Sequence, residues 1–351
     1  MVGLTFRPRL LAANLLLLCG GTLFGLFVAE LLTRIVAPQR PTPAFVWSDD
    51  KGGAIYQLDS AFGFVLRPTI DEPFIFGTHV ATNALGLRDH AYEPKRPGEF
   101  RILSLGDSYA FGYGVEVEQS YAKVVERGLN QQYPGFQFSV INAGVTGYGT
   151  LQQRLAFQRL HAKLQADLVL ATFTAANDVY DNAVFEDQLR TRLQTPLGLL
   201  GRHSHAARLL LKITFPLWFF LENRDPEGIE RTIRLLRQLE NDFRSAGVPC
   251  LMLVIPARHQ IWPSVEPAAR MLMDVGLEGL VFRQNRSIIG HLQRDRVPYI
   301  DLWPALVARD SVTPVSFAED SHLTALGHQV VGQQVLGRLH AMLPALLKQS
   351  H

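Results

Sequence analysis

Cysteine is scarce in this 351-residue chain, and an excess of charge of either sign is missing. Its two cysteines, Cys19 and Cys250, lie in an apolar N-terminal run and in a predicted buried strand. Their number and spacing exclude a disulfide framework and a zinc-binding cysteine pattern. The 34 basic and 32 acidic residues nearly balance, and no basic run or basic-aromatic stripe stands out. Nucleic acid is therefore not an expected partner.

One long uncharged run is present near the N-terminus, at Leu10–Ala29. Its length matches the roughly 20 apolar residues that cross a bilayer as a helix. Arg7 and Arg9 precede it, so the positive-inside rule predicts an exported body, on the periplasmic side in a Gram-negative cell. The run is longer than a usual signal-peptide core and no clear small-x-small cleavage site follows it. We therefore expect a single-pass anchor in residues 1–37, touching the membrane through residues 10–32, rather than a cleaved signal.

Beyond the anchor, the pattern divides the chain into an extension and a core domain. Residues 38–98 hold many Pro, Gly, Asp and aromatic residues, which predicts an irregular extension with a few strands that packs on the core. Residues 99–351 show strand–helix alternation, the signature of a parallel sheet. Strands are expected at residues 100–105, 138–142, 167–174, 249–256 and 297–302, and helices at 120–132, 151–164, 229–246, 267–294 and 324–347.

An insertion of about residues 183–228 interrupts this alternation. It contains an unusually apolar segment, Lys212–Leu221. One interpretation is a core helix broken by Pro216, because most apolar runs are core. The other is a lid over a cleft or a second membrane contact, because exposed apolar patches usually mean contact. His203 and His205 also lie in the insertion and are expected at the surface, since their spacing alone does not make a metal site.

Residues that could take part in a reaction follow four of the predicted strands. Ser108 follows the first, Gly144 the second, Asn177 the third, and the segment Asp320–His322 lies beyond the fifth. The carboxyl ends of parallel strands project toward one edge of the sheet, where open α/β sheets bind ligands. We therefore expect these four groups to converge, although each alone could be only a turn, a helix cap or a solvated loop.

The chemistry that fits the group is acyl transfer. A serine hydroxyl is a weak nucleophile that needs a base within hydrogen-bond reach, and His322 is the candidate for Ser108, with His259 the competing base. Asp320 is the expected acid that orients the histidine, and Glu319 is the alternate. The oxyanion of the tetrahedral intermediate needs hydrogen-bond donors. The expected donors are the backbone N–H groups of Ser108 and Gly144 and the side-chain amide of Asn177.

These blocks resemble the SGNH, or GDSL-type, serine hydrolase family. Gly106-Asp107-Ser108 is similar to its nucleophile block, Gly144 to its glycine block and Asn177 to its asparagine block, and His322 with the residues to His328 looks like its histidine block. The stretch Thr82–Arg88 also resembles membrane-anchored bacterial members of the family. The chain departs from the pattern at Tyr109, in place of the leucine, and at Ala175, in place of the glycine before the asparagine.

The resemblance implies a flavodoxin-like three-layer α/β/α fold and a serine esterase mechanism without cofactor or metal. We expect hydrolysis of O-acyl esters, such as acetyl esters of envelope polysaccharide. An O-acetyltransferase that passes the acyl group to a glycan would use the same triad and is the first alternative. A non-catalytic glycan-binding or scaffold protein is the second. The sequence identifies no protein partner.

Overall fold

A computed structural model of the chain describes residues 8–36, 55–174, 177–190, 204–207, 209–210, 226–256, 277–317 and 322–348. The chain divides into two compact units. One joins Met1–Pro41 with Arg190–Trp218, and the other joins Thr42–Leu189 with Phe219–His351. The segment Lys212–Leu221 and the competing base His259 lie outside the described residues.

The first unit contains the long helix α1, Pro8–Val36. Its stretch Leu17–Val36 has a mean hydropathy of 1.5 and is almost wholly exposed, so it is long and apolar enough to cross a membrane. Near its end, the Glu30 carboxylate accepts hydrogen bonds from the Ser204 hydroxyl at 2.7 Å and from the His205 and Ala206 N–H groups at 3.0 Å each. Residues 204–206 of the insertion are therefore hydrogen-bonded to this helix.

The second unit is built on a five-stranded sheet in which every neighbouring pair is parallel. The strands are β5 (Glu99–Leu105), β6 (Gln137–Asn142), β7 (Leu168–Thr174), β8 (Cys250–Ile255) and β9 (Tyr299–Asp301). Their order is β6-β5-β7-β8-β9, which is the flavodoxin-like 2-1-3-4-5 arrangement. The predicted fold class is thus confirmed, and each expected strand agrees with an observed one to within two residues at either end.

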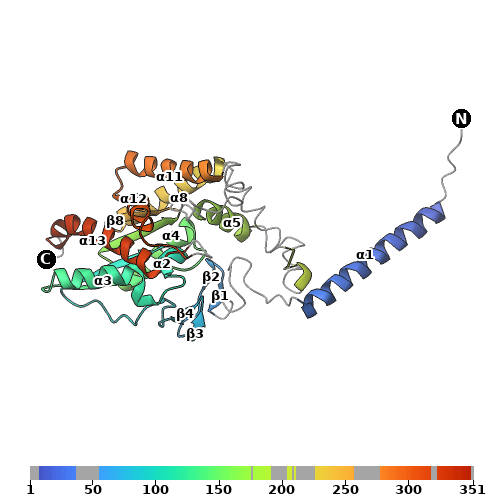
Figure 1. Ribbon diagram of the computed structural model, residues 1–351, viewed down its shortest axis with the longest axis horizontal. Helices are drawn as coiled ribbons and strands as arrows, with labels where there is room; N and C mark the ends of the chain where they lie inside the picture. Colours follow the sequence, from blue (N-terminus) through green and yellow to red (C-terminus); the bar gives the residue numbers. More distant parts are fainter. Residues whose placement is uncertain are drawn as a thin grey trace. The chain divides into compact units, whose positions relative to one another are not determined.

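Helices cover both faces of this sheet (Figure 1). One face packs against α3 (Tyr121–Gln132), α12 (Trp303–Asp310) and α13 (Ala325–Leu347). The other packs against α4 (Thr150–Leu164), α8 (Pro226–Ser245) and α11 (Leu277–Arg294). Strands β5 and β7 are buried along their whole length, because side chains on both of their faces meet a helical layer. The sequence did not predict α12, and the expected start of α11 lies outside the described residues.

The extension forms two antiparallel hairpins (Figure 1). Strand β1 (Tyr56–Asp59) pairs with β2 (Gly63–Leu66), and β3 (Asp71–Ile75) pairs with β4 (Thr78–Ala81). Their apolar side chains belong to the same buried cluster as those of α4 and α8. Following the hairpins, Asp89 forms an ion pair with Lys123 of α3 at 2.8 Å, with both side chains almost fully buried. The extension is therefore part of the second unit's core.

His328, the last residue of the predicted histidine block, lies one turn into α13 and is 1 % exposed. Its Nδ1 accepts the backbone N–H of Tyr121 at 3.2 Å, so the ring serves as a neutral cap for the first turn of α3. Burial, with the neighbouring His322 and Arg88, lowers the pKa of His328 to about 3. Only the unfolded chain therefore takes up a proton at this residue as the pH falls from about 6.5 toward 3.

Because of His328, the free energy of unfolding is expected to decrease as the pH is lowered. The contribution of His328 to this free energy is complete above pH 6.5 and is smaller by about 2 kcal/mol at pH 5, since each pH unit is worth about 1.4 kcal/mol. Urea titrations at pH 7 and pH 5 measure the difference. His328→Asn keeps an oxygen that can accept the Tyr121 N–H but has no proton to gain, so its acid-side loss should be smaller by that amount. Equal losses in both proteins would contradict the assignment.

Candidate functional site

The site begins where β5 ends and the chain turns into the short helix α2, Ser108–Phe111. Asp107 caps this helix, because its Oδ1 accepts the Tyr109 N–H at 2.9 Å. Ser108 is therefore the first helical residue, and its own N–H has no intrahelical acceptor. Ser108 follows β5, which pairs with β7. The strand order reverses between these two strands, and doubly wound sheets bind ligands at such a point.

Ser108 and His322 are in direct contact although 214 residues separate them. The distance from His322 Nε2 to Ser108 Oγ is 2.7 Å, within the hydrogen-bond reach that a nucleophile and its base require. Ser108 is 8 % exposed, so most of the residue is shielded from bulk water. The sequence predicted this pairing, and the fold brings the two side chains together.

The backbone around His322 is fastened on both sides. The Phe317 N–H donates to the His322 carbonyl at 3.0 Å, and the Thr324 N–H donates to the Val315 carbonyl at 2.9 Å. Thr324 also caps α13, because its hydroxyl accepts the Gly327 N–H at 3.3 Å. Between these anchor points lie the two candidate acids, Glu319 and Asp320, which are outside the described residues.

The loop after β6 packs tightly against α2. A Cβ added to Gly144 would lie 2.3 Å from the Phe111 nitrogen, so only glycine fits at this approach. The Gly144 N–H, an expected oxyanion donor, donates to Asn142 Oδ1 at 3.1 Å. Another donor follows in the same loop at Gly147, which is half-buried with φ +76°.

The Gly147 N–H forms no hydrogen bond with any residue that the structure describes, whereas the Gly144 N–H does. The turn that contains Gly147 is closed by the Tyr148 N–H on the Val145 carbonyl at 3.1 Å. A turn whose third residue has a positive φ favours glycine at that position. The close spacing of Gly144, Gly147 and Gly149 in the sequence indicates a loop that could supply an oxyanion donor. The spacing alone does not show which of these N–H groups lacks a hydrogen-bond acceptor.

Asn177 lies at the end of β7 beside the Asp107 carboxyl. Its Nδ2 donates to Asp181 Oδ2 at 2.5 Å, which uses one of its two amide hydrogens and fixes the side chain. Burial raises the pKa values of Asp107 and Asp178, and it raises the pKa of Asp181 to about 8. The common cause is desolvation, which disfavours the charged form of each carboxyl group behind Ser108.

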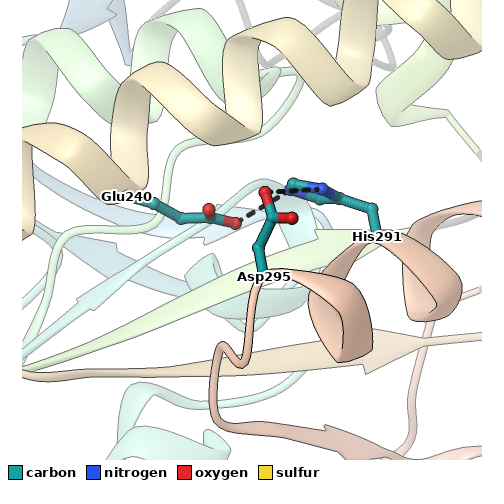
Figure 2. A group of neighbouring side chains, drawn as sticks. All are labelled: Glu240, His291 and Asp295. Atoms are coloured by element: carbon teal, nitrogen blue, oxygen red, sulfur yellow. Dashed lines mark hydrogen bonds and ion pairs between the residues drawn. The ribbon is translucent and has the colours of Figure 1, made fainter.

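A different cluster joins α8 to the end of α11, where Figure 2 shows the carboxylates of Glu240 and Asp295 both directed at the His291 ring. Its Nε2 lies 3.1 Å from Glu240 Oε1 and its Nδ1 lies 3.4 Å from Asp295 Oδ2. Residues of these types could hold a metal ion, and their ligand atoms lie within 4.8 Å of one another. However, each ring nitrogen faces a different carboxylate, and Asp295 also pairs with Arg237 at 3.3 Å. This geometry fits a link between helices.

Comparison with known proteins gives one family match. The model of the GDSL-like lipase/acylhydrolase family matches residues 104–330, a stretch that includes Ser108, Gly144, Asn177 and His322. No curated protein matches the chain.

Several solved structures are similar to part of the chain. The acetyl xylan esterase AlAXEase is 14% identical, with a TM-score of 0.44 over 68% of this chain and 99% of its own. TesA is 14% identical, with a TM-score of 0.43 over 70% of this chain and 99% of its own. A catalytic mutant of Axe2, an acetylxylan esterase from Geobacillus stearothermophilus, is 15% identical, with a TM-score of 0.42 over 68% and 92%.

Proposed function

The chain belongs to the GDSL-like lipase/acylhydrolase family, and from this premise we propose that it is a membrane-anchored serine esterase that hydrolyses O-acyl esters at Ser108. The observation that carries the proposal is the 2.7 Å contact between Ser108 Oγ and His322 Nε2 at the switch point of the sheet. A nucleophile and a base at hydrogen-bond distance are the minimum that covalent acyl transfer requires.

The reaction follows from the placement of these atoms. His322 Nε2 takes the Ser108 hydroxyl proton as Oγ attacks the ester carbonyl, and a tetrahedral oxyanion forms. The protonated ring then donates to the departing alcohol oxygen, which leaves an acyl group on Ser108. Water repeats the sequence: His322 removes its proton, the water oxygen attacks the acyl carbon, and Ser108 leaves with the proton returned.

The oxyanion needs donors that are not already engaged. The Ser108 N–H at the start of α2 meets this requirement. The side-chain amide of Asn177 is the second proposed donor, and its hydrogen bond to Asp181 fixes its position beside the site. Of the two glycine N–H groups, we favour Gly147 over the expected Gly144, because the Gly144 N–H already donates to Asn142.

The triad acid is proposed from the sequence to be Asp320, with Glu319 the alternate. A carboxylate on His322 Nδ1 would hold the tautomer that leaves Nε2 free to accept the serine proton. Separate alanine replacements distinguish the two: the variant that loses the larger share of kcat identifies the acid. If both stayed fully active, the assignment of a triad acid to this segment would be wrong.

We also propose that α1 anchors the enzyme and that its body lies outside the cytoplasm. The apolar stretch Leu17–Val36 supports the anchor, and Arg7 and Arg9 before the helix support the orientation. Acetyl esters of an envelope polysaccharide would be substrates reachable from this location.

The function is tested with the full chain in detergent micelles. It is incubated with short-chain aryl esters, with an acetylated glycan, and with a bare glycan together with an acyl donor. Free acid released from the first two supports the esterase, provided that a fluorophosphonate labels the protein at Ser108. Net transfer to the bare glycan at a rate above hydrolysis would instead indicate an acyltransferase. Absence of both activities, with no labelling, would refute an enzymatic role for this site.

A further inference from the structure

The loop Gly112–Gly114, directly after α2, has no role in the chemistry described so far. Both glycines have positive φ, +81° at Gly112 and +77° at Gly114, which side-chain-bearing residues rarely adopt. A Cβ on Gly114 would lie 2.7 Å from the ring of Phe317, so the segment that leads to His322 packs directly on this loop. Tyr113 is thus held between two positions that favour glycine, on a backbone in contact with the histidine segment.

Tyr113 places its ring against His322. The two ring centroids are 4.1 Å apart with an interplanar angle of 23°, a stacked arrangement. On its other side Tyr113 stacks on Phe76, at 4.4 Å and 30°. The rings of Phe76, Tyr113 and His322 therefore form a continuous stack that joins the extension to the base.

The backbone of Phe76 adopts an energetically unfavourable conformation. It lies in the turn between β3 and β4 with φ +54°, a conformation unfavourable for a bulky residue without other contacts to maintain it. Its side chain is 6 % exposed and also meets the edge of Phe111 at 6.2 Å. The hairpin thus holds a strained residue in place behind Tyr113.

We propose that Tyr113 is a positioning residue for His322, with Phe76 as its support. Resting on the proposed function, this inference assigns the extension a part in the reaction. Stacking fixes the plane of the imidazole so that Nε2 faces Ser108 Oγ, and the face of the tyrosine ring attracts the imidazolium that forms when the serine proton is taken. Tyr109, at 5.3 Å and 42° from His322, restricts the ring further.

Other charged and titratable groups act on the same ring. Asp107 lies close enough to interact with His322 electrostatically, and the neighbouring His328 does so from the start of α13. The candidate acids Glu319 and Asp320 adjoin it in sequence. None of these groups is altered by a change at Tyr113, so a shift in the pH profile of such a variant reports the stack.

The test compares Tyr113→Ala and Tyr113→Phe in the full chain. Tyr113→Ala is expected to lower kcat roughly ten- to a hundredfold while KM changes by less than about threefold, since a small misplacement of a base is costly and substrate contacts remain. The acid limb of its kcat/KM profile should move to lower pH by about half a unit, because the imidazolium loses an aromatic neighbour. Tyr113→Phe keeps the ring and should restore both values.

Phe76→Ala should reproduce part of the kcat loss, whereas Phe74→Ala, on the same hairpin and 60 % exposed, should not. A Tyr113→Ala enzyme with unchanged kcat and an unmoved acid limb would overturn the inference, as would a change in KM alone, which indicates a substrate wall. Should Tyr113→Ala fail to fold by circular dichroism, Tyr113→Leu gives the same comparison. If the wild-type enzyme showed no Ser108-dependent hydrolysis, the proposed function itself would be wrong, and the role of Tyr113 would not be the cause.

Discussion

Replacing Ser108 with alanine is expected to lower kcat for ester hydrolysis by about 10⁴- to 10⁶-fold, with KM little changed. The hydroxyl is the atom that would carry the acyl group, and the Cβ that remains cannot form an ester. The surrounding structure should persist without the hydroxyl, because the backbone of α2 is held by Asp107 and by its own hydrogen bonds. Initial rates with an aryl ester, at concentrations that span KM, measure the effect.

A double variant makes this expectation sharper. His322→Ala should cost nearly as much as Ser108→Ala, and the two together little more than either, because the groups act as a unit. Independent contributions would instead multiply. Ser311→Ala is the matched control, since the hydroxyl of this exposed serine donates to the Ala308 carbonyl near the end of α12, and its loss should leave kcat unchanged. Ser108→Ala with more than a tenth of wild-type kcat would refute the serine mechanism.

The sheet and the pairing of Ser108 with His322 could be predicted because both depend on local patterns. Strands buried on both faces are continuous apolar runs, and in a parallel sheet their carboxyl ends necessarily share an edge. The short helix α12 was missed because eight residues beginning Trp303-Pro304 do not show an amphipathic period long enough to recognise.

The parts that could not be predicted depend on which backbone groups find partners. Nothing in the spacing of Gly144 and Gly147 reveals that Asn142 accepts the N–H of the first. Likewise, the stack on His322 needs a hairpin from the extension to reach a loop that follows β5. Such contacts are tertiary. The glycines on either side of Tyr113 indicate an unusual backbone conformation, but they do not indicate that the Tyr113 ring contacts His322.

Arg88 is the clearest example of such a contact. The stretch Thr82–Arg88 resembled a family motif, but its purpose is visible only in the fold: the guanidinium is 1 % exposed and donates to four backbone carbonyls. Two are those of Phe111 and Gly112, at 3.2 and 2.7 Å, where α2 ends and its carbonyls lack helical donors. The others, at 2.7 and 2.9 Å, belong to His79 and Val115. One side chain thus joins the extension to the helix that carries Ser108.

Arg88→Ala is therefore expected to lower the free energy of unfolding by about 4 kcal/mol or more, because it leaves several buried carbonyls without donors and opens a cavity beside Phe111. Although burial lowers the pKa of Arg88 to about 10, the group stays charged at neutral pH, and its hydrogen bonds to carbonyls are of the stronger, charge-assisted kind. Arg88→Lys should recover only part of the loss, because an ammonium lacks the planar fork that reaches four acceptors. Urea denaturation at pH 7 followed by circular dichroism measures both variants.

The matched control is Arg127→Ala, a half-exposed arginine whose ion pair with Glu118 at 3.6 Å should contribute less than about 1 kcal/mol. The same Arg88 variants should lose kcat out of proportion to KM in the fraction that remains folded, since α2 and Tyr113 lie on the backbone that Arg88 holds. Should Arg88→Ala unfold at the same urea concentration as Arg127→Ala and keep full kcat, then the contacts of Arg88 are incidental. In that case the extension contributes to the site through the Phe76–Tyr113 stack alone.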